Sequence, residues 1–191
     1  MLKELLLRSR SYRSFDQSFR IDRKTLLELI DHARLAPSSI NLQMLKFRPV
    51  TDEGECAALL ASTKWAGKIK DQTLPPKGHA PTAYIVICAD TEVIASAASF
   101  QKDVGICAQT IMLAAAERNL GGCMIGSFSQ DVLRRDLKLA DRFVPMLVLA
   151  LGKPDEVIEL TDLPADGDTS YYRENGVHFV PKRALEDVVI E

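Results

Sequence analysis

The chain has 191 residues, of which 47% are hydrophobic and 26% are charged, and its formal net charge is −2. A single domain of this length buries roughly 70% of the surface that its unfolded chain exposes. The sequence has no apolar run near the roughly 20 residues that a membrane span requires, and its N-terminus lacks a signal peptide's apolar core and cleavage site. We therefore expect a globular, cytoplasmic protein that does not bind a membrane.

The first third of the chain predicts three helices and one strand. Leu2 to Arg8 has apolar residues at helical spacing and predicts the first helix. Asp22 is a suitable N-cap for the second helix, and Pro37 ends it because the residue before a proline disfavours helical dihedral angles. A short strand over 45–51 and a helix over 53–62 follow.

A long polar loop is expected over residues 63–81, which contain Pro75, Pro76 and Gly78 and show no clear period. Loops of this length in compact domains often form lids or pocket rims. Trp65, the only tryptophan, lies in this loop. It either forms a wall for a substrate or packs as a surface aromatic onto its own loop.

Two buried strands and a long helix predict the core. Residues 83–89 form a continuous apolar run, typical of a central strand, and 145–151 form a second one. Between them, 95–120 predicts one helix that Gly121 ends, and 129–139 predicts a shorter helix with its cap. Because the long helix is apolar on nearly all sides, we expect a partner subunit to cover one of them.

The last 40 residues are acidic and irregular after Gly152 and recover an apolar pattern at 177–180 and 185–190. Residues 153–170 hold six acids and one lysine, so a loop is expected there. A tail with such apolar side chains has to dock on another surface.

Two short polar stretches near the N-terminus carry the functional signal. The first, residues 9–15, places Arg10, Ser11 and Arg13 within four positions, which suits a phosphate dianion because arginine forms bidentate, charge-assisted bonds to its oxygens. The second, residues 36–43, offers small hydroxyls and an amide that can bond the polar edge of a planar ligand. Together they predict a mononucleotide-like cofactor. A surface loop and a plain helix-ending turn are the alternatives.

The two stretches resemble the signature of the flavin-dependent nitroreductase family. That signature reads Arg-Arg-Ser-x-Arg-x-Phe and then Ala-Pro-Ser-Ser-x-Asn-x-Gln-Pro-Trp. The likeness extends over nearly the whole chain and includes the glycine-rich 121–126 and the C-terminal 181–183. Ser9 stands where the family often has its first arginine, and Met44-Leu45 replaces Pro-Trp, which indicates a branch with a different pocket floor.

The resemblance implies an FMN site made from several segments. Arg10, Ser11 and Arg13 would hold the phosphate, and Lys182 and Arg183 would join them if the tail folds back, with Arg183 the better match. The implied cofactor-binding residues are Arg10, Ser11, Arg13, Pro37, Ser38, Ser39, Asn41, Gln43, Gln109, Met124, Ile125, Gly126, Lys182 and Arg183.

The flavin ring has its own implied contacts. Residues 37–41 match positions that line the isoalloxazine and ribityl chain, with Asn41 at the ring edge. Residues 124–126 resemble the segment near N5, where a backbone amide can donate a hydrogen bond; a buried strand is the alternative. Gln43 either contacts the cofactor or satisfies strand backbone, and Gln109, expected to be buried, bonds either the flavin or a neighbouring helix.

The implied fold is α+β, with a mixed, mostly antiparallel central sheet surrounded by helices in an intertwined homodimer. Residues 1–191 would form one FMN-binding domain, with 171–191 an extension that packs on the partner subunit. The implied activity passes hydride from NADH or NADPH through flavin N5 to a nitroaromatic, quinone or enone in a ping-pong cycle, with no catalytic side chain. An FMN storage or redox-sensing protein, or a dehalogenase or flavin-fragmenting enzyme, is the alternative.

Metal and nucleic-acid functions are not favoured. The four cysteines are widely spaced and have apolar neighbours, and the three histidines are scattered, so we expect reduced core thiols and no metal site. Residues 1–24 hold seven Lys/Arg against three Asp/Glu, but no nucleic-acid-binding motif accompanies them. We expect a small-molecule substrate and no nucleic-acid partner.

Overall fold

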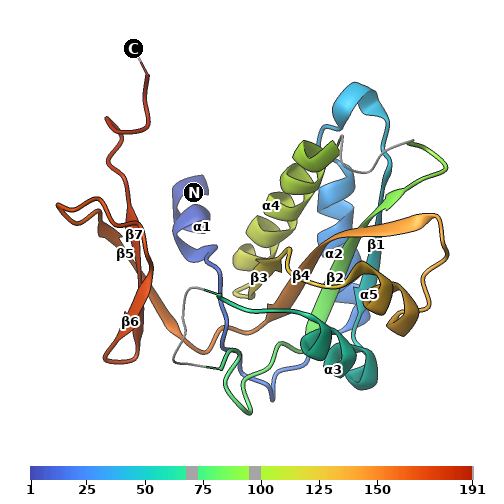
Figure 1. Ribbon diagram of the computed structural model, residues 1–191, viewed down its shortest axis with the longest axis horizontal. Coiled ribbons are helices and arrows are strands. Elements are labelled where there is room, and N and C mark those ends of the chain that lie inside the picture. Colours follow the sequence, from blue (N-terminus) through green and yellow to red (C-terminus); the bar gives the residue numbers. More distant parts are fainter. Residues whose placement is uncertain (68–72, 95–99, 191) are drawn as a thin grey trace.

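The computed structural model describes residues 1–67, 73–94 and 100–190 (Figure 1). The helices are α1 (Leu2–Arg8), α2 (Arg23–Arg34), α3 (Glu53–Ser62), α4 (Gln101–Glu117) and α5 (Gln130–Asp136), with one 3-10 turn, η1 (Ser39–Asn41). The strands are β1 (Leu45–Val50), β2 (Ala83–Asp90), β3 (Gly121–Ile125), β4 (Phe143–Gly152), β5 (Val157–Asp162), β6 (Tyr172–Glu174) and β7 (Val177–Lys182).

The central sheet has the order β1-β2-β4-β3, and its neighbouring strands are antiparallel. Every residue of β2 is buried, as its continuous apolar sequence predicts. Its Ile85 and Ile87 pack with residues of α2 and α4 on one face, while Tyr84 and Val86 pack with α3 and α5 on the other. The predicted α+β class with a mostly antiparallel sheet between helices is confirmed.

The helix starts follow from their caps. Asp22 accepts a hydrogen bond from the backbone N–H of Thr25 at 2.7 Å, and Asp52 accepts one from Glu55 at 2.9 Å. The helices predicted over 2–8 and 53–62 have the expected bounds. Among the described residues, no helix is long and apolar enough to cross a bilayer.

Helix α4 is shorter than predicted. The expected span was 95–120, of which 95–99 lie outside the described residues, and the helix ends at Glu117. Gly121 does not end it: Asn119 takes the left-handed conformation, with φ of 57°, and Gly121 begins β3. Glycine is needed at 121 because a Cβ there would collide with the side chains of Tyr12 and Pro154.

One side of α4 is exposed in the single chain. Gly105 and Gln109 are exposed, and the Ile106 residue is 41% exposed, whereas Val104, Ala108 and the residues toward the sheet are buried. Gln109 is thus exposed in the single chain, and its burial would require the expected partner subunit. Coverage of this side by a partner stays a prediction.

The loop over 63–81 contains no helix or strand among its described residues; residues 68–72 lie outside them. The Trp65 indole N–H donates to the hydroxyl of Thr63 at 3.1 Å, and the ring packs beside the core. This geometry agrees with an aromatic that packs onto its own loop.

We expected the segment after Gly152 to be irregular, but it forms strands. Strand β5 pairs in parallel with β7, and β6 pairs antiparallel with β7, so the three form a second sheet beside α1 (Figure 1). The prediction of a loop over 153–170 was wrong because apolar residues at 157, 158 and 160 pair with β7 despite their acidic neighbours. After β7, the side chains of Leu185, Val188 and Val189 are exposed.

Candidate functional site

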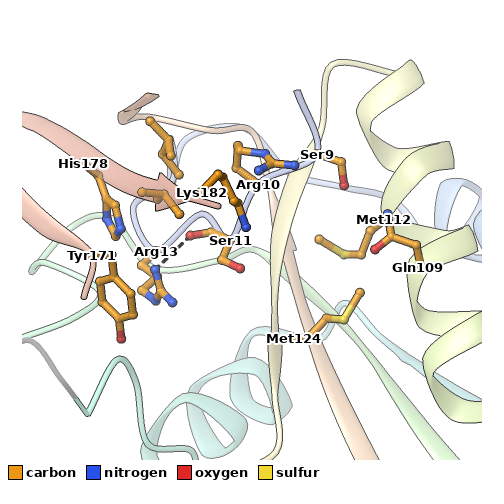
Figure 2. Close-up of a pocket in the computed structure, with 12 residues that line it drawn as sticks. Ser9, Arg10, Ser11, Arg13, Gln109, Met112, Met124, Tyr171, His178 and Lys182 are labelled. Atoms are coloured by element: carbon orange, nitrogen blue, oxygen red, sulfur yellow. Dashed lines mark hydrogen bonds between the residues drawn. The ribbon is translucent and has the colours of Figure 1, made fainter. Parts of the chain in front are cut away.

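A cavity of about 370 Å³ lies between the N-terminal loop, α4, β3 and the second sheet. Arg10, Ser11 and Arg13 line it from the N-terminal loop, and Lys182 lines it from β7 (Figure 2). Three cationic side chains therefore face one space. Throughout, this space is called the cationic cavity.

The N-terminal loop is held by its two aromatic residues. The backbone N–H of Tyr12 donates to the carbonyl of Gly122 at 2.9 Å, and Ser11 forms an isolated bridge with Gly122 of β3. Phe15 is fully buried and occupies the space that a Cβ at Gly152 would need. The half-buried ring of Tyr12 lies against Gly121, while Arg10 and Arg13 line the cavity. The same loop thus packs its aromatic residues against the protein and presents its arginines to the cavity.

The two arginines keep unused hydrogen-bond donors. Arg10 donates to the carbonyl of Leu6, and Arg13 donates to that of Ser11 at 3.1 Å. The Nε atoms of Arg10 and Arg13 are buried and have no partner among the described residues. The Arg13 guanidinium also lies 5.1 Å from the ring centre of Tyr171. A ligand with acceptor oxygens would satisfy the unused donors.

Glu156 fixes the loop from behind and was not identified from the sequence. Its side chain is 5% exposed, forms an ion pair with Arg173, and accepts hydrogen bonds from the backbone N–H groups of Arg13 and Ser14. Removal of a charge this buried would leave those donors unpaired. Glu156 therefore joins the N-terminal loop to the second sheet.

His178 is a second residue that the sequence did not single out. It lines the cationic cavity, is 2% exposed, and stacks on Tyr171 with ring centres 5.3 Å apart. Burial, together with the charges of Arg13 and Arg173, lowers the pKa of His178 to about 4. Its Nδ1 is buried with no partner among the described residues.

Side chains along β7 alternate between the two faces of the strand, and this distinguishes Lys182 from Arg183. Residues 178, 180 and 182 line the cavity, as expected for one face of a strand. Lys182 thus belongs to the cavity, whereas Arg183 is exposed and does not line it. A contact between Arg183 and the cofactor stays a prediction.

The opposite wall comes from α4 and β3. Gln109, Met112 and Met124 line it (Figure 2). Ile125 points into the core and is 4% exposed, while a Cβ at Gly126 would meet open space. Neither Ile125 nor Gly126 is among the residues that line the cationic cavity.

The second predicted stretch lines a different cavity of about 320 Å³. Ser38 and Gln43 line it together with Asp103 and Cys107 of α4. Pro37, Ser39 and Asn41 are exposed next to it and do not line it.

A buried carboxylate holds this second loop. Asp103 is 2% exposed and accepts hydrogen bonds from the backbone N–H of Ser39 at 2.9 Å and from its hydroxyl at 2.6 Å. Ile40, Asn41 and Gln43 have positive φ angles of 49°, 56° and 52°. Such conformations are uncommon for residues other than glycine and cluster at functional sites.

Helix α4 separates the two cavities. Positions 103 and 107 lie on one side of a helix with 3.6 residues per turn, and positions 109 and 112 lie on nearly the opposite side. The residues predicted to hold the two ends of one cofactor are therefore not brought together within a single chain.

Comparison with known proteins decides the family. The model of the nitroreductase family matches residues 6–153, which is most of the chain. The chain belongs to the nitroreductase family. The resemblance drawn from the two polar stretches is thus confirmed.

Relatives of this nitroreductase-family chain are distant in sequence. YodC of Bacillus subtilis (strain 168), provisionally named an NAD(P)H nitroreductase, is 24% identical over 170 residues that cover 75% of this chain and 84% of YodC. The structure of an FMN-dependent nitroreductase from Clostridium difficile R20291 is 25% identical, with a TM-score of 0.64, and the match covers 80% of this chain and 87% of that one. A provisionally named nitroreductase from Exiguobacterium sibiricum 255-15, solved in complex with FMN, is 21% identical with a TM-score of 0.69, and the match covers 87% and 94%.

Cys107 lines the second cavity, and the other three cysteines line neither cavity. All four are free and buried, and burial raises the pKa of Cys56 to about 11 and of Cys88 to about 12. Within the described ranges, no group of three or more His, Cys, Asp or Glu could hold a metal ion.

Proposed function

We propose that the protein is an FMN-dependent NAD(P)H oxidoreductase that passes hydride to a small electrophilic acceptor, such as a nitroaromatic, a quinone or an enone, in a ping-pong cycle. The observation that supports this most is the convergence of Arg10, Arg13 and Lys182 on one cavity. Family membership and the names of the relatives from B. subtilis and C. difficile support the choice of NAD(P)H and FMN.

The cationic cavity fits the phosphate end of FMN. A phosphate dianion carries acceptor oxygens, and the cavity supplies three cations and two serine hydroxyls, with the buried Nε atoms of two of these cations unpartnered within the described part of the chain. The hydroxyls belong to Ser9 and Ser11, so Ser9 offers one donor where the family often has an arginine. Each charge-assisted bond would stabilise the bound phosphate by about 1.5–3 kcal/mol.

We further propose that each FMN site is shared between two subunits of a homodimer. The cationic cavity and the loop at 38–43 lie on opposite sides of α4. The loop that completes a cationic cavity would therefore come from the partner. Ile106 on α4 and the exposed apolar residues after β7 offer surface for such contact. Residues 171–191 would then pack on the partner, as expected from the family.

Bound FMN would supply the group that accepts hydride from nicotinamide and gives it to the acceptor. The chain's own residues would bind and orient. Arg10, Arg13 and Lys182 would neutralise the phosphate, and Met112 and Met124 would form an apolar wall that excludes water.

Purification of the protein tests the proposal directly. We expect a yellow protein with the absorbance of oxidised flavin, release of FMN on denaturation, and steady oxidation of NADH or NADPH with menadione or a nitrofuran. Bound FMN without turnover would favour a storage or sensing role instead. A colourless protein that also fails to bind added FMN would contradict the proposal.

A further inference from the structure

His178 differs from the other ionisable residues of the cationic cavity. Arg10 and Arg13 are half-buried and Lys182 is exposed, whereas His178 is 2% exposed. Its ring lies beside Arg13 and over Tyr171 (Figure 2). Its buried Nδ1 lacks a hydrogen-bond partner among the residues that the structure describes. A buried polar atom without a partner requires an explanation.

The charges around this ring are mostly positive. Arg13 faces it from the N-terminal loop, Arg173 from β6, and Lys182 shares its face of β7. Glu156, the carboxylate next to this group, is already paired with Arg173 and with the backbone of the loop. Because Glu156 is engaged by Arg173, an imidazolium at 178 would add a further cation beside Arg13 and Lys182.

We propose that His178 couples cofactor binding to protonation: its imidazole takes up one proton from solvent when a phosphate dianion enters the cationic cavity. This inference rests on the proposed binding of the FMN phosphate there. The proton adds to a ring nitrogen, and no bond of the ligand breaks.

The physical reason is a reversal of the local field. Burial and the two arginines hold the pKa of His178 at about 4 in the protein alone, so the ring is neutral at neutral pH. An opposite charge within about 4–6 Å raises the pKa of such a group by roughly 1 to 3. A dianion bound beside the ring would thus raise the pKa of His178 toward its ordinary value. Below neutral pH, the bound complex then carries a proton that the free protein lacks.

Calorimetric titration measures this proton. FMN is titrated into the apoprotein at pH 5.5 in buffers that differ in ionisation enthalpy, for the wild type and for His178→Gln. The wild type should take up about half a proton more than His178→Gln. The FMN phosphate itself ionises at about pH 6 and is coupled to His178, so its own proton is measured separately in each protein, from the phosphorus NMR shift of bound FMN, and is added to the calorimetric balance. Riboflavin, which lacks the phosphate, should show no difference between them.

Histidine NMR provides a second measurement that needs no substitution in the cavity. The chain has three histidines, and His32 and His79 do not line the cavity. One ring should titrate near pH 4 in the apoprotein and at least about one pH unit higher with FMN. His32→Gln assigns one of the other two sets of ring signals.

The outcomes separate this inference from the proposed function. If the wild type fails to bind FMN at all, the phosphate-binding function itself is contradicted. If FMN binds but proton uptake is equal in the wild type and His178→Gln, and no histidine midpoint rises, the inference alone is overturned.

Discussion

The arginines of the cationic cavity combine charge with unused donors, and their removal has a predictable cost. Arg10 and Arg13 each bond one carbonyl of their own segment and keep a buried Nε free of partners among the described residues. Since a charge-assisted bond contributes about 1.5–3 kcal/mol, Arg10→Ala or Arg13→Ala should lower FMN affinity roughly 10- to 150-fold. Fluorescence titration of the apoprotein measures the affinity.

A matched arginine serves as the control for this experiment. Arg135 is exposed on α5 and pairs with Asp136. Arg135→Ala should therefore leave FMN affinity unchanged. Wild-type affinity in both cavity variants would mean that the phosphate binds elsewhere.

His178 also predicts how the stability of the apoprotein depends on pH. Its pKa is about 4 in the folded protein and 6.5 ordinarily, so between these values the unfolded chain binds more protons than the folded one. The free energy of unfolding should therefore fall as the pH drops from 6.5 toward 4, by on the order of 2 kcal/mol. Urea unfolding at several pH values measures this loss.

The same pH series on two histidine variants shows whether His178 causes this loss of stability. His178→Gln should show a flatter pH dependence than the wild type, while His32→Gln, on the exposed side of α2, should retain the wild-type slope. An unchanged slope in His178→Gln would show that another group causes the acid sensitivity.

At the scale of elements, Glu156 joins the N-terminal loop to the second sheet. Glu156→Ala would leave Arg173 without its buried partner and two backbone N–H groups without acceptors. Loss of one partner of a buried pair costs about 3–5 kcal/mol, so we expect that decrease in the free energy of unfolding. Glu159→Ala, at an exposed position of β5, should change it by no more than about 0.5 kcal/mol. Urea unfolding that ranks the two variants equally would contradict this role.

Helices and strands that a local pattern marks, such as a cap or an apolar run, could be predicted from the sequence. Those without such a pattern could not. The second helix begins at the predicted cap Asp22, and β2 has the predicted continuous apolar run. Strand β5 escaped notice because its pairing partner β7 lies 20 residues further along the chain and its own composition is acidic. For the same reason, the sequence could not separate Lys182 from Arg183, since the register of β7 decides which of them faces the cavity.

At the scale of the whole molecule, the site depends on contacts between distant segments. The sequence identified Arg10, Ser11 and Arg13 because they lie within one short motif. Glu156 and His178 stand more than 140 residues away, and only the fold brings them to that motif. No local pattern marks either residue, so the sequence could not have assigned them.

The exposed apolar surface of the single chain also belongs to this scale. Leu2 on α1, Ile106 on α4, and Leu185, Val188 and Val189 near the C-terminus are exposed. Exposed apolar side chains of this size can contribute to an interface between subunits. We propose that these segments pack in the homodimer, because both the proposed shared FMN site and the tail require a partner.

Subunit complementation tests the shared site most directly. One chain carries Arg10→Ala and Arg13→Ala in the cationic cavity. The other carries Ser38→Phe, which places a ring in the second cavity. Each variant alone should bind FMN poorly. After the two are mixed, unfolded and refolded together, the hybrid dimers should contain one intact site, so about one quarter of all sites should bind FMN at wild-type affinity. If no binding returns although hybrid dimers form, each FMN site lies within one chain and the shared-site account is wrong.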